Sequence, residues 1–362
     1  MSTPVSDFDF RLPKDRIAQH SVEPRDASRM LFLDRCSGKT SHHLFHDLPG
    51  LLRPGDLLVF NNTKVFKARL EVRLRGKMHE LFLLRCLDGP GYSRSGVRPG
   101  SDPISRWEAL IRGARRFCVG DAFSIGDLSA RLVQKSPDTT GAVEIEIDAD
   151  RFSVLTHCDR YGHIPVPLYV EREPERMEDY QTIYADPVGS VAAPTSGFHF
   201  TDRVFDALLK RGVEKTFVTL HVGLGTFQPV RTETLEEHTM HAEWVEIREE
   251  AAEEINRAKR EGRRVIAVGT TVVRTLEGVA KMADVSRVGG ARPYQGDINI
   301  FITPGFDFKI IDGLLTNFHL PKSTLLALVC AFAGRERVLN GYEEAVLLGY
   351  RFYSFGDAMF IS

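Results

Sequence analysis

Residues 219–244 have the sequence TLHVGLGTFQPVRTETLEEHTMHAEW, and the other segments of the chain can be arranged around them. The β-branched residues Thr216, Val218 and Val222 favour a β-strand that runs into this stretch. The strand is then interrupted at Gly223, and titratable side chains follow. A strand that ends in glycines and titratable groups predicts a ligand site at the carboxyl end of a sheet strand. An ordinary turn after an ordinary strand explains the GLG triplet equally well.

Three histidines, His221, His238 and His241, lie within this stretch. His238 and His241 are three residues apart, so in a helix they would share one face. The HExxH spacing of a zinc site is absent and no cysteine lies nearby. Structural or substrate-binding roles therefore fit these histidines better than metal binding, and we expect no metal.

The segments that follow alternate strands with helices. Residues 263–280, RRVIAVGTTVVRTLEGVA, predict a buried strand, a small-residue turn that forms an anion or ligand pocket, and a helix. We also predict an amphipathic helix over 246–262 and a strand within GDINIFITPGF at 296–306. Ser323 or Thr324 is expected to cap a final apolar helix. This alternation predicts an α/β fold with a mostly parallel sheet.

Residues 68–149 have a different pattern. Segments such as ARLEVRL, RWEALIRG and AVEIEI alternate apolar and polar residues, with turn-forming clusters between them, which is typical of a small all-β barrel. We therefore predict an α/β catalytic domain made of residues 1–67 and 150–362, with an inserted β-barrel domain over 68–149. The loop 89–102 is expected to be mobile.

Composition restricts the class of protein. The length of 362 residues, with 43% hydrophobic and 27% charged residues, favours a globular protein of about two domains. A net charge of −2 gives no overall sign of nucleic-acid binding, although a local basic groove remains compatible with RNA. The five scattered cysteines suit a reducing cytoplasm. The first residues lack the apolar core of a signal peptide, and the apolar run 325–333 is too short to cross a bilayer. We therefore expect a cytoplasmic protein.

Common catalytic motifs are absent. The sequence contains no GxxxxGK[ST] P-loop and no GxSxG nucleophile elbow, and GLGTFQ lacks the third glycine of a dinucleotide-binding loop. The residues alone thus predict a two-domain α/β enzyme whose site gathers His, Thr, Arg and acidic residues from several loops. They do not identify its substrate.

Seven motifs occur in fixed order along the chain: GDLLVFNNTKVFKARL (55–70), SVAAPTSGFHFT (190–201), TLHVGLGTFQPV (219–230), EHTMHAEW (237–244), AVGTTVVRTLE (267–277), TNFHLPKSTLLALVCAFAG (316–334) and YRFYSFGDAM (350–359). Together they resemble S-adenosylmethionine:tRNA ribosyltransferase-isomerase, a family of queuosine biosynthesis. Asn62 stands where that family usually has an acid, so we give position 62 no proton-transfer role.

The resemblance implies an unusual use of S-adenosylmethionine. Its ribosyl group is transferred and isomerised onto 7-aminomethyl-7-deazaguanine at the tRNA wobble position, giving epoxyqueuosine-tRNA, adenine and methionine. S-adenosylmethionine is then a consumed substrate, tRNA is the partner, and we expect a monomer. The reaction needs a base for the ribose C5′ protons, a neutral attacking amine and protonation of the leaving adenine, and histidine suits such proton transfers.

The resemblance also suggests roles for individual residues. His221 and His241 are expected to act as base and acid, with Asp357 near the sulfonium or the amine. Arg274 would bind the methionine carboxylate. Caps, salt bridges and turns explain many of these residues equally well. The expected substrate-binding residues are His199, Thr270, Thr271, Arg274, Glu277, Asn317 and His319, and the expected tRNA-binding residues are Arg25, Arg29, Lys64 and Lys67.

Two other functions remain open. A methyltransferase would use the same S-adenosylmethionine but would release S-adenosylhomocysteine, and the chain lacks the glycine-rich first loop of that class. A non-catalytic RNA-binding module would bind tRNA without consuming anything, and it would not need so many polar residues at the ends of sheet strands.

Overall fold

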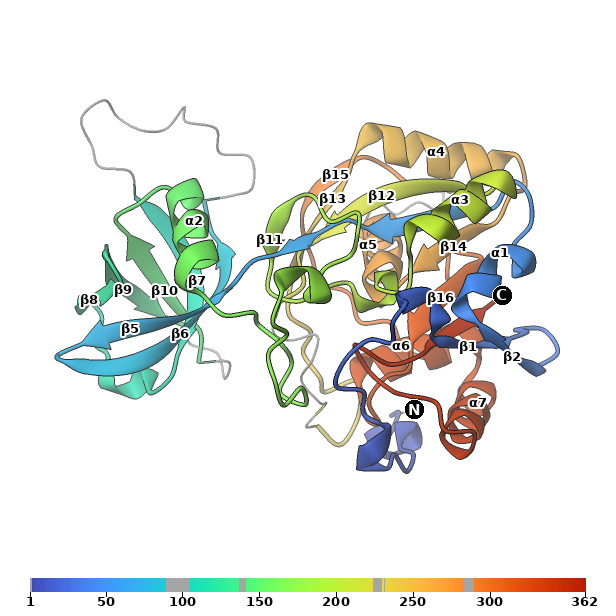
Figure 1. The fold of residues 1–362 in the computed structure, drawn as a ribbon, viewed down its shortest axis with the longest axis horizontal. Helices are drawn as coiled ribbons and strands as arrows, with labels where there is room; N and C mark the ends of the chain where they lie inside the picture. Colours follow the sequence, from blue (N-terminus) through green and yellow to red (C-terminus); the bar gives the residue numbers. More distant parts are fainter. Residues whose placement is uncertain (1, 89–103, 137–140, 224–229, 231, 283–289) are drawn as a thin grey trace.

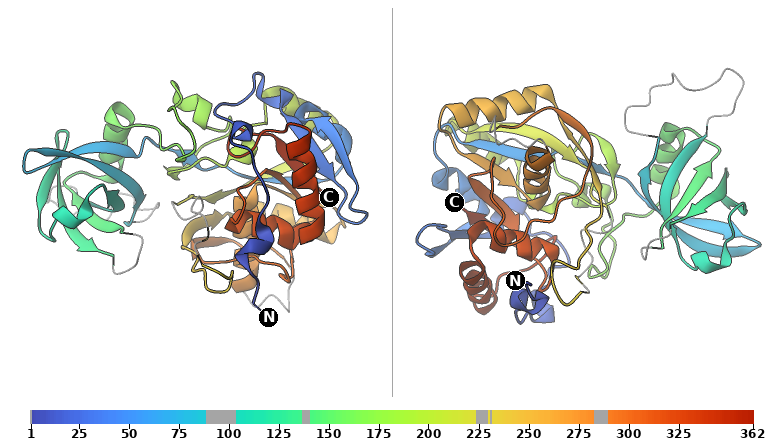
Figure 2. Two further views of the ribbon diagram at one scale, coloured as in Figure 1. Left: turned by 90° about the horizontal axis from the view of Figure 1, so that it is seen from below. Right: turned by 180° about the vertical axis from the view of Figure 1, so that it is seen from behind.

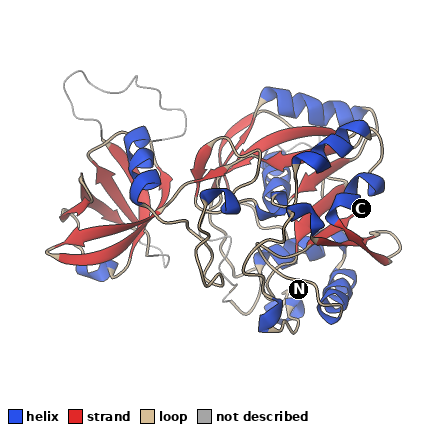
Figure 3. Ribbon diagram, viewed as in Figure 1, coloured by secondary structure: helices blue, strands red, loops and turns tan. Residues whose placement is uncertain are grey.

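The computed structural model describes residues 2–88, 104–136, 141–223, 230, 232–282 and 290–362. It consists of an α/β core and a small β-barrel that lies to one side of it (Figure 1). Colouring by secondary structure separates the helix-covered sheet of the core from the mostly stranded barrel (Figure 3). The chain enters the barrel from the core, and it returns to the core after helix α2 (Arg151–Tyr161).

Among the described residues the core contains a nine-stranded mixed sheet in the order β15-β13-β12-β3-β14-β16-β17-β1-β2. Its central strands β12, β3, β14 and β16 run parallel to one another, and antiparallel pairs lie toward both edges. The strands are β1 (Arg29–Leu33), β2 (Thr40–Leu44), β3 (Leu57–Asn61), β12 (Glu214–Leu220), β13 (Glu243–Ile247), β14 (Val265–Val268), β15 (Tyr294–Ile298), β16 (Gly313–Asn317) and β17 (Ala358–Ile361).

Helices cover both faces of this sheet, so its central strands β3, β14 and β16 are buried along their whole length. In β3, Leu57 and Val59 pack with α4 (Glu249–Arg260), α5 (Thr270–Met282), α6 (Thr324–Ala333) and α7 (Arg335–Leu347). The alternate residues Leu58 and Phe60 pack on the other face with α1 (Leu48–Leu51) and α3 (Asp202–Lys210). The predicted α/β core is therefore confirmed, with a mixed sheet in which the four central strands are parallel and β17 and β1 form a further parallel pair near one edge.

The barrel is closed, in the order β10-β7-β6-β5-β8-β9, and its interior holds apolar side chains around the buried Trp107. Helix α2 covers the barrel through Val154 and Cys158. Figure 2 shows the barrel beside the core from two further directions. The inserted all-β barrel is thus confirmed. The boundaries at 67/68 and 149/150 stay predictions, and the loop 89–102 lies entirely outside the described residues. The barrel strands are β5 (Arg69–Leu74), β6 (Lys77–Cys86), β7 (Ser105–Ile111), β8 (Ala122–Ile125), β9 (Leu128–Lys135) and β10 (Val143–Ile147).

A short pair of parallel strands, β4 (Lys64–Val65) and β11 (Val188–Ser190), lies beside the two crossings between barrel and core. Helices α3 and α6 begin with side-chain caps, of which the one at Ser323 was predicted. Thr201 Oγ1 accepts from the Val204 amide at the start of α3, and Ser323 Oγ accepts from the Leu326 amide at the start of α6. Both hydroxyls satisfy donors that have no partner within their helices.

The structure differs from three local expectations in detail. The helix predicted from residue 246 begins at Glu249, because EWVEI before it alternates outward and inward side chains and forms the edge-side strand β13. The strand predicted within 296–306 lies earlier, at 294–298, where it pairs with β13. No helix forms over 238–241, so His238 and His241 do not share a helical face.

Candidate functional site

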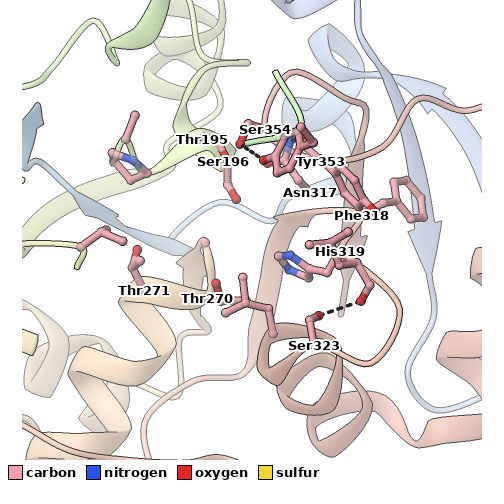
Figure 4. A pocket seen from close by; sticks show the side chains of 17 residues that line it. Thr195, Ser196, Thr270, Thr271, Asn317, Phe318, His319, Ser323, Tyr353 and Ser354 are labelled. Carbon is pink, nitrogen blue, oxygen red and sulfur yellow. Dashed lines mark hydrogen bonds between the residues drawn. The ribbon is translucent and has the colours of Figure 1, made fainter. Parts of the chain in front are cut away.

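A cavity lies where the central parallel strands end. Strand β14 turns at Gly269, whose φ of +93° favours glycine, into helix α5, and β16 ends nearby at Asn317. The cavity encloses about 690 Å³, part of it open to solvent. Polar side chains from several separate segments surround it (Figure 4). The lining residues are Tyr169, Ala193, Pro194, Thr195, Ser196, Val222, Gly269, Thr270, Thr271, Asn317, Phe318, His319, Leu320, Ser323, Leu325, Tyr353 and Ser354.

Asn317 has an acceptor available in this cavity. Its Nδ2 donates to the Tyr353 carbonyl oxygen at 3.1 Å and to His199 Nε2 at 3.3 Å. Its buried Oδ1 has no hydrogen-bond partner among the described residues. An unpaired buried amide oxygen is costly, so one that lines a cavity marks a position for a ligand donor.

Tyr353 has an unusual backbone conformation at the cavity wall. Its φ is +72°, in the left-handed region that side chains other than glycine rarely adopt. The Asn317 amide holds its carbonyl oxygen, and its ring lies 4.7 Å from the ring of Tyr169. Tyr169 is fixed in turn by a 2.5 Å hydrogen bond between its hydroxyl and Ser354 Oγ, and burial raises its pKa to about 12. The two rings form a rigid aromatic wall that suits a planar ligand group.

His319 is the one histidine among the residues that line the cavity. Its Nε2 lies 3.0 Å from Thr316 Oγ1, and its backbone amide donates to the Tyr342 hydroxyl. Burial lowers the pKa of His319 to about 3, so the imidazole is neutral near pH 7. A neutral imidazole offers one donor and one acceptor for hydrogen bonding.

Thr270 and Thr271 lie in the first turn of α5, where the backbone amides of a helix have no partners within the helix. The Thr271 hydroxyl accepts from Asn61 Nδ2 at 3.3 Å. Asn61 also bonds both backbone groups of Leu220, at the end of β12. Asn61 therefore links the end of β3 to the end of β12 and to the start of α5.

Asn61 is a residue that sequence reasoning missed. The polar run Asn61-Asn62-Thr63 directly after a buried strand was a signal that could have found it. The other two residues of the run also contact the end of β12, since Asn62 Oδ1 accepts from the Thr219 hydroxyl and Thr63 Oγ1 lies 2.7 Å from His221 Nδ1.

His199 lies beneath the cavity wall and supports it. Its Nε2 contacts the Asn317 amide, its Nδ1 lies 2.7 Å from Ser28 Oγ, and its ring stacks on Phe45. Burial, with the positive charges of Arg351 and Arg25 nearby, lowers its pKa to about 3. His199 therefore reaches the cavity through Asn317.

The two histidines predicted as base and acid lie elsewhere. His221 is stacked on Trp244 at 4.9 Å, and a side chain at Gly189 would collide with its ring. Burial lowers the pKa of His221 to about 3. His241 is exposed in a loop. Neither lines the cavity, although Val222, next to His221, does.

The buried carboxylates have structural contacts. Asp357 accepts from the backbone amides of Arg29 and Arg351, and Glu277 accepts from the amides of residues 309–311. Burial raises the pKa of both carboxyl groups. Neither residue lines the cavity, so the structure provides no contact through which they would bind substrate there.

Arg274 forms a buried ion pair with Glu243, which also accepts from the Gly223 amide. Arg274 is a buried residue of helix α5 and does not line the cavity. Its Nε and one terminal nitrogen have no partner among the described residues. Through Glu243, the ion pair connects helix α5 with Gly223, where the chain leaves strand β12.

The four residues predicted to contact tRNA differ in exposure. Arg25 donates to the carbonyl oxygens of Gln181 and Glu178, and Arg29 donates to the Leu348 carbonyl oxygen over the Tyr350 ring. Lys67 donates to the Asp159 carbonyl oxygen. Lys64 is exposed. Of the four, Lys64 is the best placed for a phosphate, and the roles of the others stay predictions.

The chain is similar to known proteins over nearly its whole length. A model of the family described as "Queuosine biosynthesis protein" matches residues 5–361. The chain belongs to this family. It is 47% identical to the S-adenosylmethionine:tRNA ribosyltransferase-isomerase of Desulfitobacterium hafniense and 48% identical to that of Carboxydothermus hydrogenoformans, each over 99% of both chains. The crystal structure of S-adenosylmethionine tRNA ribosyltransferase from Thermotoga maritima is 34% identical, with a TM-score of 0.54, over 99% of this chain and 100% of that one.

In this member of the queuosine biosynthesis family, the cavity thus combines four predicted residues, Thr270, Thr271, Asn317 and His319, with an aromatic wall that was not predicted. Within the described part of the chain, no group of three or more His, Cys, Asp or Glu is arranged to hold a metal ion. A search of the same residues finds no helix long and apolar enough to cross a membrane.

Proposed function

We propose that this enzyme transfers and isomerises the ribosyl group of S-adenosylmethionine onto 7-aminomethyl-7-deazaguanine at the tRNA wobble position, in the cavity at the ends of β14 and β16. Epoxyqueuosine-tRNA, adenine and methionine are the products. Family membership and the names of the two full-length relatives support this reaction. The observation that carries the location is the unpaired Asn317 Oδ1 beside an aromatic wall.

Adenine fits the aromatic side of the cavity. Its ring would stack on the wall formed by Tyr169 and Tyr353, and its amino group would donate to Asn317 Oδ1. This hydrogen bond would satisfy an oxygen that otherwise lacks a partner among the described residues. His319, neutral near pH 7, would hydrogen-bond a ring nitrogen or a ribose hydroxyl. A pKa of about 3 makes it a poor proton acceptor, so we assign it to positioning.

The methionine end fits the start of α5. The positive end of the α5 dipole and the hydroxyls of Thr270 and Thr271 favour a carboxylate. We propose this position in place of Arg274, whose guanidinium is paired with Glu243.

The target base must leave the stacked anticodon loop to reach this cavity. The opening of the cavity to solvent gives such a base a route to a bound S-adenosylmethionine. We further propose that the enzyme acts as a cytoplasmic monomer on a tRNA that carries the queuosine precursor, with Lys64 among its phosphate contacts.

Incubation with S-adenosylmethionine and tRNA bearing the aminomethyl-deazaguanine base tests this function. We expect adenine and methionine in equal amounts, with the tRNA gaining the mass of the ribosyl-derived group. Release of S-adenosylhomocysteine with methylation of the tRNA would instead identify a methyltransferase. Binding of tRNA without any small product would leave only a recognition module.

A further inference from the structure

The outer face of the barrel has a second hollow. It encloses about 870 Å³, part of it open to solvent, and it shares no lining residue with the strand-end cavity. Strand β5, the turn after β8 and the end of helix α2 form its sides. The residues that line it include Glu71, Arg73, Gly126, His157 and Tyr161.

Tyr161 offers an aromatic surface in this hollow. The residue is 50% exposed, and its ring lies 4.7 Å from the ring of His157 behind it. His157 is buried and its Nδ1 lies 2.9 Å from an Asp127 carboxylate oxygen. Gly126 leaves room for this imidazole, since a Cβ there would lie 2.7 Å from it. The Tyr161 ring therefore contacts His157, and about half of the residue is exposed to solvent.

Two opposite charges lie on the same strand face beside this ring. In β5, Glu71 and Arg73 point outward, because they alternate with the buried Leu70, Val72 and Leu74 of the barrel core. Both residues are exposed and line the hollow. A carboxylate accepts hydrogen bonds from the N–H groups of a guanine or cytosine edge, and a guanidinium binds phosphate.

The Arg160 guanidinium lies over the Tyr161 ring, 5.0 Å from its centroid, and adds positive charge and a second planar group on which a base can stack. An aromatic ring, a carboxylate and nearby guanidinium groups together match the three parts of a nucleotide: its flat face, its hydrogen-bonding edge and its phosphate.

We propose that this hollow binds an unpaired nucleotide of the tRNA substrate. The base stacks on Tyr161, its N–H donors bond to Glu71, and Arg73 contacts a phosphate. The identity of the RNA rests on the proposed function. Extrusion of the wobble base disturbs the stacking of other bases in the loop, so unstacked nucleotides are available to a second site on the enzyme.

Replacement of the ring tests the proposal. Tyr161→Ala should weaken tRNA binding, measured by filter binding, by about tenfold, since stacking of one base on an aromatic side chain has an effect of this order. The KM for tRNA should rise, with kcat and the KM for S-adenosylmethionine unchanged. Tyr161→Phe keeps the ring and should bind tRNA like the wild type.

Phe152→Ala is the matched control. Phe152 is 79% exposed on the same helix, nine positions before Tyr161 and thus on the opposite side, and it does not line the hollow. This variant should bind tRNA normally. If Tyr161→Ala binds tRNA as tightly as Phe152→Ala does, the proposal is overturned.

Arg73→Gln gives a second measurement that does not depend on how Tyr161→Ala folds. It should weaken tRNA binding and reduce the slope of log affinity against log salt concentration by about one. An unchanged slope would count against the phosphate contact and the site. The wild-type enzyme distinguishes the two proposals: absence of adenine release overturns the proposed function, whereas RNA binding by these variants still tests the hollow.

Discussion

The cavity at the strand ends and the hollow on the barrel use polar groups in opposite ways. The cavity groups Asn317 and His319 are neutral and held by hydrogen bonds, Asn317 to the distant Tyr353 and His319 to the nearby Thr316. The barrel hollow exposes the charged Glu71 and Arg73 beside a half-exposed ring. Neutral, fixed groups with little water suit chemistry on a reactive cation, whereas exposed charges suit recognition of a large, hydrated polyanion.

Buried and exposed ion pairs differ in the same way, and breaking a buried pair has the largest expected effect on stability. Arg274→Met removes one partner of the buried pair with Glu243 and leaves a buried carboxylate. We expect the free energy of unfolding to fall by about 3–5 kcal/mol, measured by urea denaturation. Arg106→Met on the barrel, whose side chain is half exposed beside Asp88, should change it by at most about 1 kcal/mol. Equal losses of unfolding free energy in the two variants would contradict this difference between buried and exposed ion pairs.

Removal of the unpaired acceptor should reduce activity. Asn317→Leu cannot accept a hydrogen bond from the substrate, so we expect kcat/KM for S-adenosylmethionine to fall about a hundredfold. The matched control is Asn62→Ala, because Asn62 also follows a central strand but contacts Thr219 outside the cavity. Its kcat/KM should stay within about threefold of wild type. A wild-type rate for Asn317→Leu, in a folded protein, would remove Asn317 from the site.

The buried histidines should make stability depend on pH. Burial lowers the pKa values of His199, His221 and His319 to about 3, below the usual value near 6.5. Between these values the unfolded chain binds protons that the folded chain does not, so stability should decrease as pH falls from about 6.5 toward 3 and stay level above 6.5. His199→Asn should flatten this dependence. The exposed His20→Asn should leave it unchanged.

The smallest effect is expected at His241. It is exposed and does not line the cavity, so His241→Ala should keep turnover within about threefold of wild type in a steady-state assay. A larger loss would restore its predicted catalytic role and would extend the site beyond the strand-end cavity.

Local signals predicted much of the fold. The period-two segments of 68–149 predicted the barrel, because each inward side chain enters one closed core. The caps Thr201 and Ser323 were predictable because each lies within three residues of the amide it binds. Thr270 and Thr271 were predictable because a strand, a glycine turn and a helix follow one another in the chain. The roles of His221 and His241 stay predictions, because a histidine in a motif can also stack in a core or face solvent, and neither of these two lines the cavity.

The sequence by itself determined the class of fold, the inserted barrel, the family and four residues of the cavity. Only the tertiary structure decided which groups meet there. Tyr169 meets Ser354, and Asn317 meets Tyr353 and His199, across separations of 36 to 185 residues. It also showed that Arg274, Glu277 and Asp357 have structural partners instead of lining the cavity. The physical reason is that hydrogen bonding and burial depend on distance in space, which periodicity and short motifs do not encode.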